Sequence, residues 1–450
     1  MPDDPDLLPF TPPEAPGVRA LFGNVIETFP RSLYEEPGLR RFRTPFSDAV
    51  FVTDPDLIQE ILFTRIDEFV RDEPSRRLLT PFLGERSLIL AEGADWRWLR
   101  RALSPAFRHE LLMSFTPQVA RAAQSQVERW RREPAGQPVN VSRAMNRTSL
   151  EVITQTLFGA KGALDQKAYL EAVNALVASL PWVTLMAVMK APAWAPYPGR
   201  RRAKAVGEYF LRQVEAAGDD RRANSASSPA LFDVMARALD AEGGRAMTPA
   251  ELASSLVTML NAGHETAAAA LGWTLWLLAT HPQAQDRVAE EVSGAMGDAP
   301  IAPARLYDLA YTRQVVQEAM RLYPPAPMIT RQPKQRLRLG GEDLTPSTQI
   351  SIATWALHRN RRLWERPNGF DPGHFETDRA RQRHRYAYLA FGAGPRTCIG
   401  SGVATIELLT VLATLVRAFR FRQAPGPAPY PIARVSLRTR GGMRLLIEPR

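Results

Sequence analysis

The stretch FGAGPRTCIG, residues 391–400, contains the only cysteine in a chain of 450 residues. Gly392, Gly394 and Pro395 predict a constrained turn, and a helical pattern resumes directly after Cys398. Backbone N–H groups and the positive end of a helix dipole stabilise a thiolate at such a helix start, and Arg396 adds positive charge nearby. The position therefore suits a thiolate that binds a metal; a buried, unreactive cysteine in a turn is the alternative.

The bulk composition is that of an ordinary globular protein, with 45% hydrophobic and 23% charged residues. A single cysteine excludes an intramolecular disulfide framework and fits a reducing compartment. The acidic, proline-rich start has no signal-peptide pattern, and the apolar stretch Leu180–Met189 is too short to span a bilayer. We therefore expect a cytoplasmic protein without a membrane span.

The chain is basic, with a formal net charge of +10 and a pI of about 10.0. Such a balance indicates an acidic partner, a nucleic acid or an anionic membrane, although a general preference for arginine explains it equally well. The sequence has no evident Gly-rich phosphate loop, zinc-finger spacing or nucleic-acid module. We therefore expect no nucleic-acid partner.

A long apolar helix is predicted to begin after Thr248, because Thr248-Pro249-Ala250-Glu251 combines a capping threonine, a proline at the first position and a capping-box glutamate. The helical pattern continues to about Thr280, a length of about 45 Å. The segment is apolar on most of its circumference, as in a membrane span or the central helix of a large fold. His264 and Glu265 at its middle disfavour the membrane.

The remaining pattern predicts a mainly helical fold with a minor β part, both spread along one domain that spans residues 1–450. Segments 309–323 and 399–419 are predicted helices, and Gly218–Pro229 is a predicted flexible loop. The predicted strand-like segments are 49–53, 336–341, 349–357 and a pair around 433–447.

The full spacing Phe391-x-x-Gly394-x-Arg396-x-Cys398-x-Gly400 resembles the haem-binding loop of the cytochrome P-450 family. In that family the cysteine thiolate is the axial ligand of the haem iron. The resemblance extends from about residue 50 to the C-terminus, and about residues 1–40 are idiosyncratic. It implies the single-domain cytochrome P-450 fold, with haem b (iron protoporphyrin IX) between the long central helix and the helix after the cysteine loop.

The central helix contains Ala262-Gly263-His264-Glu265-Thr266, which resembles the oxygen-activation motif of the family. The resemblance implies that Gly263 lets the backbone approach dioxygen and the helix bulge locally, while Thr266 offers a hydroxyl and Glu265 relays protons. The family often carries a second hydroxyl residue next; Ala267 stands at this position here, and we expect it to narrow the proton path. The alternatives are a threonine bonded to a carbonyl one turn earlier and a glutamate in a structural salt bridge.

Two further motifs agree with this resemblance. Glu318 and Arg321 match the ExxR motif of the family, where they join their helix to the segment leading into the haem loop, and at i and i+3 they can pair. His374 stands where the family commonly has arginine, so the third charge of this structural lock depends on protonation.

Arginines and one tryptophan match the positions that hold the haem propionates in the family: Trp96 and Arg100 on one helical face, Arg331 and Arg396. The guanidinium fork suits carboxylates, although solvent-exposed arginines are the alternative for each one. The resemblance implies catalytic roles for Glu265 and Thr266, metal ligation by Cys398, and cofactor binding by Trp96, Arg100, Ala262, Gly263, Arg331, Phe391, Gly392, Arg396, Cys398 and Gly400.

The implied activity is a haem-thiolate monooxygenase that hydroxylates or epoxidises a lipophilic small molecule with O₂. No flavin or iron–sulfur domain is recognisable, so we expect the electrons to come from a separate ferredoxin or flavodoxin, acidic in character. Docking is expected at the arginines of TDRARQRHRY, for which a solvated basic loop is the alternative: Arg379, Arg381, Arg383 and Arg385.

The resemblance places five largely apolar segments near the distal pocket, consistent with a fatty acyl chain or a terpenoid: Leu78–Leu83, Leu180–Met189, Met259, Ala262 and Ala326–Ile329. We expect a monomer. A peroxide-dependent or isomerising haem enzyme is one alternative, and the acid–alcohol pair Glu265-Thr266 disfavours it. A non-catalytic haem sensor or carrier is an alternative of another class.

Overall fold

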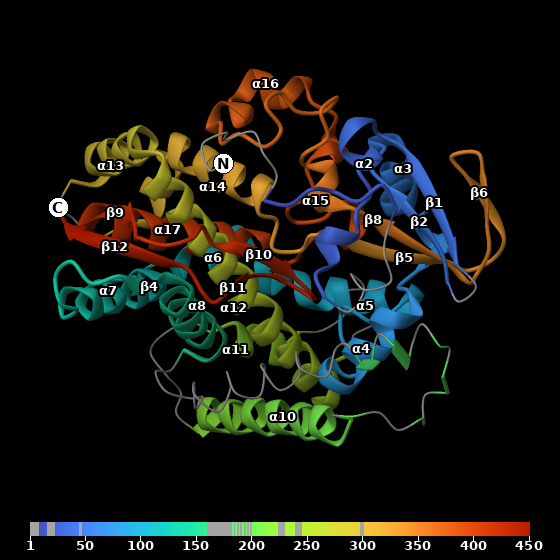
Figure 1. The fold of residues 1–450 in the computed structure, drawn as a ribbon. Helices are drawn as coiled ribbons and strands as arrows, with labels where there is room; N and C mark the ends of the chain where they lie inside the picture. The colour runs from blue at the N-terminus through green and yellow to red at the C-terminus, as the bar shows by residue number, and fades with distance from the viewer. Residues whose placement is uncertain are drawn as a thin grey trace.

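The computed structural model describes residues 9–15, 23–44, 47–159, 182–183, 185–186, 189, 191–192, 195, 198, 200–223, 230–238, 245–297 and 301–450. Helices form most of the molecule, and the largest sheet lies along one edge of it (Figure 1). The predicted mainly helical fold with a minor β part is confirmed.

The central helix α12 (Pro249–Thr280) crosses the middle of the molecule (Figure 1). The predicted capping box is present: the Glu251 backbone N–H donates to Thr248 Oγ1 at 3.2 Å, and the Thr248 N–H donates to the Glu251 carboxylate at 2.9 Å. These bonds satisfy N–H groups that the first turn leaves without partners. Most of α12 is buried, and among the helices it packs chiefly against α8 (Val141–Phe158), α14 (Ala310–Leu322) and α17 (Ser401–Ala418).

Shorter helices surround this centre. In chain order they are α2 (Ser32–Glu35), α3 (Pro55–Gln59), α4 (Glu73–Leu83), α5 (Gly93–Leu103), α6 (His109–Ser114), α7 (Thr116–Arg131), α10 (Arg200–Ala223), α11 (Leu231–Ala236), α13 (Pro282–Met296), α15 (Thr354–Leu357) and α16 (Thr377–Gln382). Among the described residues one helix, α17, is long and apolar enough to cross a membrane, but 67% of its apolar window is buried inside the protein, as in a core helix.

The largest sheet has the strand order β1-β2-β8-β5-β3. Strand β2 pairs with β8 in parallel, although some 300 residues separate them, and β5 pairs with β8 antiparallel. The strands of this sheet are β1 (Leu39–Thr44), β2 (Ser47–Val52), β3 (Phe69–Val70), β5 (Ile329–Pro333) and β8 (Thr348–Ile352). The smaller sheets contain β4 (Val139–Asn140), β6 (Leu337–Leu339), β7 (Glu342–Leu344), β9 (Phe419–Gln423), β10 (Tyr430–Ala433), β11 (Leu437–Arg440) and β12 (Arg444–Pro449).

Two local predictions were wrong. The strand predicted at 349–357 ends at Ile352, and Thr354–Leu357 form α15 because this segment turns into the core. The loop predicted at Gly218–Pro229 begins too early, since α10 continues to Ala223; residues 224–229 lie outside the described part of the chain. Tertiary contacts hold that last turn: Arg221 pairs with Asp233, and Gly218 lies against the ring of Phe232.

The structural lock predicted from Glu318 and Arg321 is fully buried. Arg321 Nε and Nη2 each donate to the Glu318 carboxylate at 2.7 Å, and the guanidinium also donates to the backbone oxygens of His358, Pro367 and Gly369. Burial alone would raise the pKa of Glu318, but the charge and hydrogen bonds of Arg321, with a hydrogen bond from His374, lower it to about 2. This cluster ties α14 to the segment leading into the cysteine loop.

His374 is the third member of the lock. Its Nδ1 lies 3.1 Å from Glu318 Oε1, and its Nε2 lies 2.8 Å from the Glu365 backbone oxygen. The two ring nitrogens thus lie within hydrogen-bond distance of the Glu318 carboxylate and of the backbone at Glu365. His374 therefore links the buried Glu318–Arg321 pair to the segment that leads into the cysteine loop.

A second buried carboxyl group, Glu407, lies on α17. It is 3% exposed, and its Oε1 has no hydrogen-bond partner among the described residues. Burial raises the pKa of Glu407 to about 8, and the nearby Ser149 hydroxyl of α8 offsets this only in part. Among the buried carboxyl groups, arginine thus lowers the pKa of Glu318, whereas burial raises that of Glu407.

Candidate functional site

The cysteine loop folds back on itself just before α17. The Cys398 N–H donates to the Phe391 backbone oxygen at 2.9 Å, and Thr397 Oγ1 donates to the same oxygen at 3.2 Å. Gly392 and Gly394 both have φ of +68°, a left-handed conformation that favours glycine. The loop delivers Cys398 to the start of α17 with an accessible thiol.

Two glycines in this loop have different packing roles. A Cβ atom on Gly394 would lie 2.0 Å from the Leu62 backbone oxygen, so the loop and the turn at Glu60–Thr64 are in direct backbone contact. A Cβ on Gly400 would lie 3.9 Å from Cys398 Sγ, which is ordinary van der Waals contact. Gly394 is therefore required for the approach of the loop to its neighbour, and Gly400 leaves space beside the sulfur.

The sulfur is accessible but is enclosed by protein on most sides, and this desolvation raises the pKa of Cys398. The Gly400 N–H and the positive charge of Arg100 act in the opposite direction. The donor predicted at the helix start is present, but the nearby charge is that of Arg100 rather than Arg396. A bound metal ion would offset the unfavourable burial of the Cys398 thiolate, because a metal ion favours the deprotonated form of a thiol.

Arg396 and Trp96 lie together at one side of the loop. The Arg396 guanidinium lies 4.5 Å from the centre of the Trp96 ring, donates to the Ala91 backbone oxygen at 2.9 Å and pairs with Glu92. Arg100 reaches the loop from α5, where its Nη1 donates to the Thr397 backbone oxygen at 3.0 Å. The predicted Trp96, Arg100 and Arg396 therefore all border the cysteine loop.

Arg331 lies on β5 and is buried, with 6% of the residue exposed. Burial, with repulsion from Arg71 and Arg396, lowers the pKa of Arg331 to about 9, and Glu92 and Asp72 offset only part of this. Arg71, Arg331 and Arg396 thus form an arginine cluster in which the positive charge exceeds the negative charge of the two nearby carboxylates.

Arg71 was not identified from the sequence. It follows β3, and the pairing of β3 with β5 brings it to Arg331. No local pattern marks it, because this strand pairing joins segments more than 250 residues apart.

The donor set fits a haem. An accessible thiol at a helix start provides a soft ligand for iron, and the surplus of guanidinium groups beside it fits two propionate carboxylates. On α12, which is otherwise mostly buried, Ala262 is exposed and Thr266 is partly exposed, one turn apart on the same face. These accessible positions form a face without large side chains.

The motif on α12 differs from its expected geometry in two respects. The Thr266 hydroxyl donates to the Ala262 backbone oxygen at 2.7 Å, which is the alternative weighed from the sequence. A Cβ on Gly263 would lie 3.0 Å from Ile153 Cδ1 of α8, so the glycine permits close packing of two helices. The expected local bulge is absent, since α12 is α-helical from Pro249 to Thr280.

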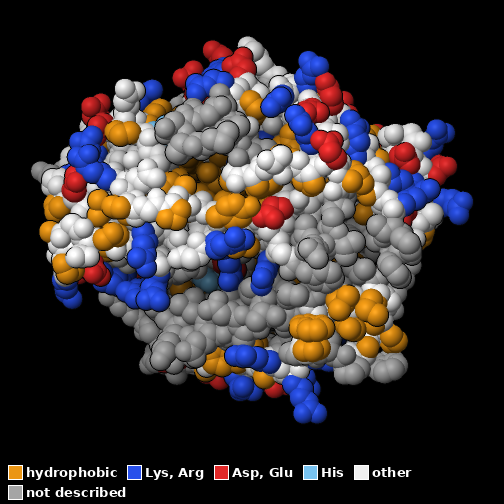
Figure 2. Space-filling view, viewed as in Figure 1, with side chains coloured by type: hydrophobic (Ala, Val, Ile, Leu, Met, Phe, Trp, Pro, Cys, Tyr) orange, Lys and Arg blue, Asp and Glu red, His pale blue; other side chains and the backbone are white. Residues whose placement is uncertain are grey.

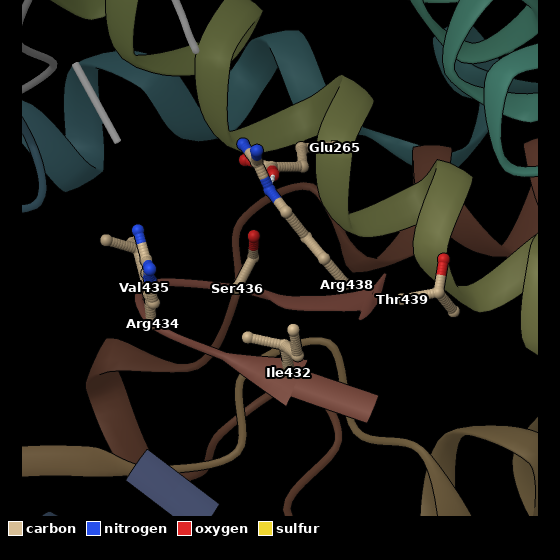
Figure 3. A pocket seen from close by; sticks show the side chains of 7 residues that line it. All are labelled: Glu265, Ile432, Arg434, Val435, Ser436, Arg438 and Thr439. Atoms are coloured by element: carbon tan, nitrogen blue, oxygen red, sulfur yellow. Dashed lines mark hydrogen bonds and ion pairs between the residues drawn. The ribbon is translucent and has the colours of Figure 1, made fainter. Parts of the chain in front are cut away.

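Glu265 forms an ion pair with Arg438 of β11, which realises the salt-bridge alternative. The pair lies at a pocket of about 200 Å³ between α12 and the β10–β11 hairpin (Figure 3). Neither catalytic side chain predicted on α12 is therefore free of intramolecular contacts.

The segments predicted to line the distal pocket are only partly described. Met259 is buried, and Arg77 of α4 donates to the Met186 backbone oxygen at 3.1 Å, so α4 adjoins part of the stretch 180–189. Within that stretch the residues other than 182, 183, 185, 186 and 189 lie outside the described part of the chain.

The arginines predicted to dock a partner have unequal environments. Arg383 stacks on the Trp364 ring at 3.8 Å and donates to the His374 backbone oxygen at 2.5 Å, and Arg379 pairs with Glu365. Arg381 and Arg385 are exposed. Arg383 thus serves the internal structure next to the lock, whereas Arg379, whose side chain is 37% exposed, is held in a surface ion pair.

Comparisons with known proteins agree with this geometry. The family model described as cytochrome P450 matches residues 27–443. The crystal structure of the cytochrome P450DA heme domain superimposes with a TM-score of 0.81 at 24% identity, covering 92% of this chain and 90% of that one. The latter similarity concerns the fold alone.

Two curated relatives are bacterial and human enzymes. Cyclooctat-9-en-7-ol 5-monooxygenase of Streptomyces melanosporofaciens is 31% identical over 94% of this chain and 92% of its own length. Human cytochrome P450 4A11 is 30% identical over 88% of this chain and 78% of its own length. The family model covers most of the chain, and members of this family carry haem on a cysteine thiolate. The chain therefore belongs to the cytochrome P450 family and is a P450 monooxygenase.

Proposed function

We propose that Cys398 is the axial ligand of a haem b and that the enzyme hydroxylates or epoxidises a lipophilic small molecule. The observation that carries this proposal is the accessible thiol of the only cysteine, placed at the start of α17 beside a cluster in which the three arginines Arg71, Arg331 and Arg396 outnumber the carboxylates Glu92 and Asp72. When bound, the haem would use O₂ and two electrons to insert one oxygen atom into a C–H or C=C bond.

The residues around the loop would hold this cofactor. Arg331 and Arg396 would bind the propionates, since their charge exceeds that of Glu92 and Asp72, and Arg100 would add charge next to the sulfur. Arg71 joins this set as a fourth cation. The accessible face of α12 would leave room for substrate on the opposite side of the cofactor.

Glu265 and Thr266 would supply protons. Thr266 would turn its hydroxyl from the Ala262 oxygen toward the reacting side, which costs one local hydrogen bond of about 1 kcal/mol. Glu265 would collect protons on the side of α12 that faces the β10–β11 hairpin. The presence of both groups favours a monooxygenase over a peroxide-dependent or isomerising enzyme.

A reduced-plus-CO absorption spectrum tests the thiolate ligand. We expect the spectrum typical of a thiolate-bound haem for the wild-type protein and its loss in Cys398→Ser. Purified protein that carries no haem, or a Cys398→Ser variant with an unchanged spectrum, contradicts the assignment. Product formation then separates an enzyme from a haem sensor, which would bind gas without turnover.

The electron donor is proposed to be an acidic ferredoxin or flavodoxin that docks on the cysteine side. Arg381 and Arg385 are the exposed cations of the predicted patch, and the turn at Arg385 packs on α3. The turn after α3 contacts the cysteine loop and carries Phe63, which is 52% exposed. An apolar centre with cations near it suits a protein partner of opposite charge.

The matched test changes the same charge at two places. Arg381→Glu with Arg385→Glu should slow reduction by a ferredoxin, and the effect should shrink at high salt. Arg201→Glu with Arg212→Glu is the control, because both are exposed on α10 at the opposite end of the molecule (Figure 1). Equal reduction rates for both double variants would contradict this docking site.

The substrate is proposed to be lipophilic because the segments that the family resemblance places near the distal pocket are largely apolar, among them the buried Met259. The name of one relative specifies the alcohol cyclooctat-9-en-7-ol, which is of this kind. A library screen for substrate-induced shifts of the haem spectrum tests the class, and binding restricted to polar compounds would contradict it. We further propose a cytoplasmic, monomeric, single-domain enzyme, which size-exclusion chromatography and limited proteolysis test.

A further inference from the structure

The pocket between α12 and the β10–β11 hairpin connects solvent with the middle of the central helix. Its volume is about 200 Å³, and it is lined by Glu265, Ile432, Arg434, Val435, Ser436, Arg438 and Thr439. Figure 3 shows the Arg438 side chain extended from β11 to the Glu265 carboxylate, with the Ser436 hydroxyl directed into the same space. Figure 2 shows Lys and Arg side chains around a hollow near the centre of this face.

The hairpin holds Arg438 at a fixed place. β10 and β11 pair with Ile432 opposite Arg438, and Thr439 Oγ1 lies 3.0 Å from Ser142 Oγ of α8. The Asn24 side chain binds the β10 backbone, accepting from the Ala433 N–H at 2.8 Å. A guanidinium supported in this way holds its partner more closely than one on a loop would.

Stability does not account for the ion pair. The Arg438 side chain is 33% exposed and that of Glu265 is 18% exposed, and pairs this open to water contribute little to folding. The helix is held by its buried apolar residues, such as Leu271 and Trp273. A glutamate at this position next to Thr266 therefore calls for a functional explanation.

We propose that Arg438 is a positioning residue for Glu265 and that the pocket is the route by which solvent protons reach this carboxylate. The inference rests on the proposed monooxygenase function. A hydronium ion in the pocket water protonates the Glu265 carboxylate, which becomes a carboxylic acid, and leaves a water molecule behind. The acid then turns toward Thr266 and gives its proton to the Thr266 hydroxyl oxygen, which passes its own proton on to the reacting side, and the carboxylate returns to Arg438.

Chemical rescue with acetate tests the proposal. Glu265→Ala leaves Arg438 and Arg434 facing a solvent-connected pocket that holds a small carboxylate in place of the lost side chain. Without acetate we expect the product formed per electron to fall roughly tenfold. Acetate should restore most of this yield and raise the Tm of the Glu265→Ala holoenzyme, with chloride of equal ionic strength as the control.

The double variant Glu265→Ala with Arg438→Gln isolates the arginine. In the double variant, acetate should neither restore the product yield nor raise the Tm. Acetate should also have neither effect on the wild-type enzyme. Acetate effects that persist in the double variant overturn the role of Arg438, and a rise in Tm without recovery of yield overturns the proton route. These outcomes differ from failure of the proposed function itself, in which the wild-type enzyme forms no oxygenated product.

A second set of variants separates positioning from general structure. Arg438→Gln should lower product per electron with unchanged KM, and Arg438→Lys should retain most of the yield because it keeps the charge. Arg440→Gln is the matched control on the same strand, since Arg440 is exposed and lies over the Tyr430 ring. Equal losses in Arg438→Gln and Arg440→Gln would overturn the assignment.

Discussion

The contact between Gly394 and Leu62 makes a quantitative prediction for the cysteine loop. Gly392 and Gly394 have the same φ of +68°, so an alanine at either position pays the same backbone cost of about 1–2 kcal/mol. The new Cβ at position 392 meets nothing closer than Ile329 Cδ1 at 3.9 Å. Gly392→Ala is therefore the control for backbone strain alone.

Gly394→Ala adds a collision with backbone. Its Cβ would lie 2.0 Å from the Leu62 oxygen and 2.9 Å from the Leu62 carbonyl carbon, and Leu62 is 2% exposed. The two segments must separate by more than about 1 Å, and overpacking of this kind costs about 1–3 kcal/mol or more. We expect Gly394→Ala to be less stable than Gly392→Ala by roughly 2 kcal/mol.

Urea unfolding of both variants measures this difference, and the ratio of bound haem to protein reports the loop directly. Gly394→Ala should lose more haem during purification than Gly392→Ala, because only the new Cβ at position 394 collides with the backbone. Equal unfolding midpoints and equal haem contents would refute the reasoning, because they would mean that the turn at Leu62 moves aside without cost.

Three further predictions concern charged groups in the core. The lowered pKa of Glu318 contributes roughly 3 kcal/mol of stability, which is present above about pH 4.5 and is lost as the pH falls toward 2. Glu318→Gln leaves Arg321 without its carboxylate at neutral pH, and it should remove this loss of stability in acid, which the urea unfolding midpoint between pH 3 and 6 measures. The raised pKa of Glu407 has the opposite effect, because the stability of the protein falls as the pH rises from about 4.5 to 8. Glu407→Gln should therefore stabilise the protein at pH 7 by roughly 3 kcal/mol and flatten the dependence of Tm on pH in this range, and an unchanged dependence would show that Glu407 is ionised in the folded protein. Arg331→Gln relieves the repulsion from Arg71, so the Tm of the haem-free protein should stay the same or rise. Because the variant also lacks a cation that would bind a propionate, haem should transfer from it to apomyoglobin roughly tenfold faster, and an unchanged transfer rate would exclude Arg331 from haem binding.

The limits of α12 and α14 were predictable because the signals that set them are local. The capping box of α12 involves residues three apart, and the ExxR pair on α14 lies on one helical face. The turn at the cysteine loop likewise follows from glycines and a proline within ten residues. Interactions across one or two helical turns join residues that are close together in the sequence. The sequence alone therefore determined these elements and the position of Cys398 ahead of a helix.

Packing between distant segments decided the rest. The ion pair of Glu265 with Arg438 joins residues 173 apart, and that of Arg396 with Glu92 joins residues 304 apart. No local pattern specifies which of many arginines meets which carboxylate, and this is also why Arg71 was missed. The inward turn of Arg383 depends on the ring of Trp364 in the same way. Such partners are set by how helices and strands pack in three dimensions, where burial selects one pairing among many that the sequence permits.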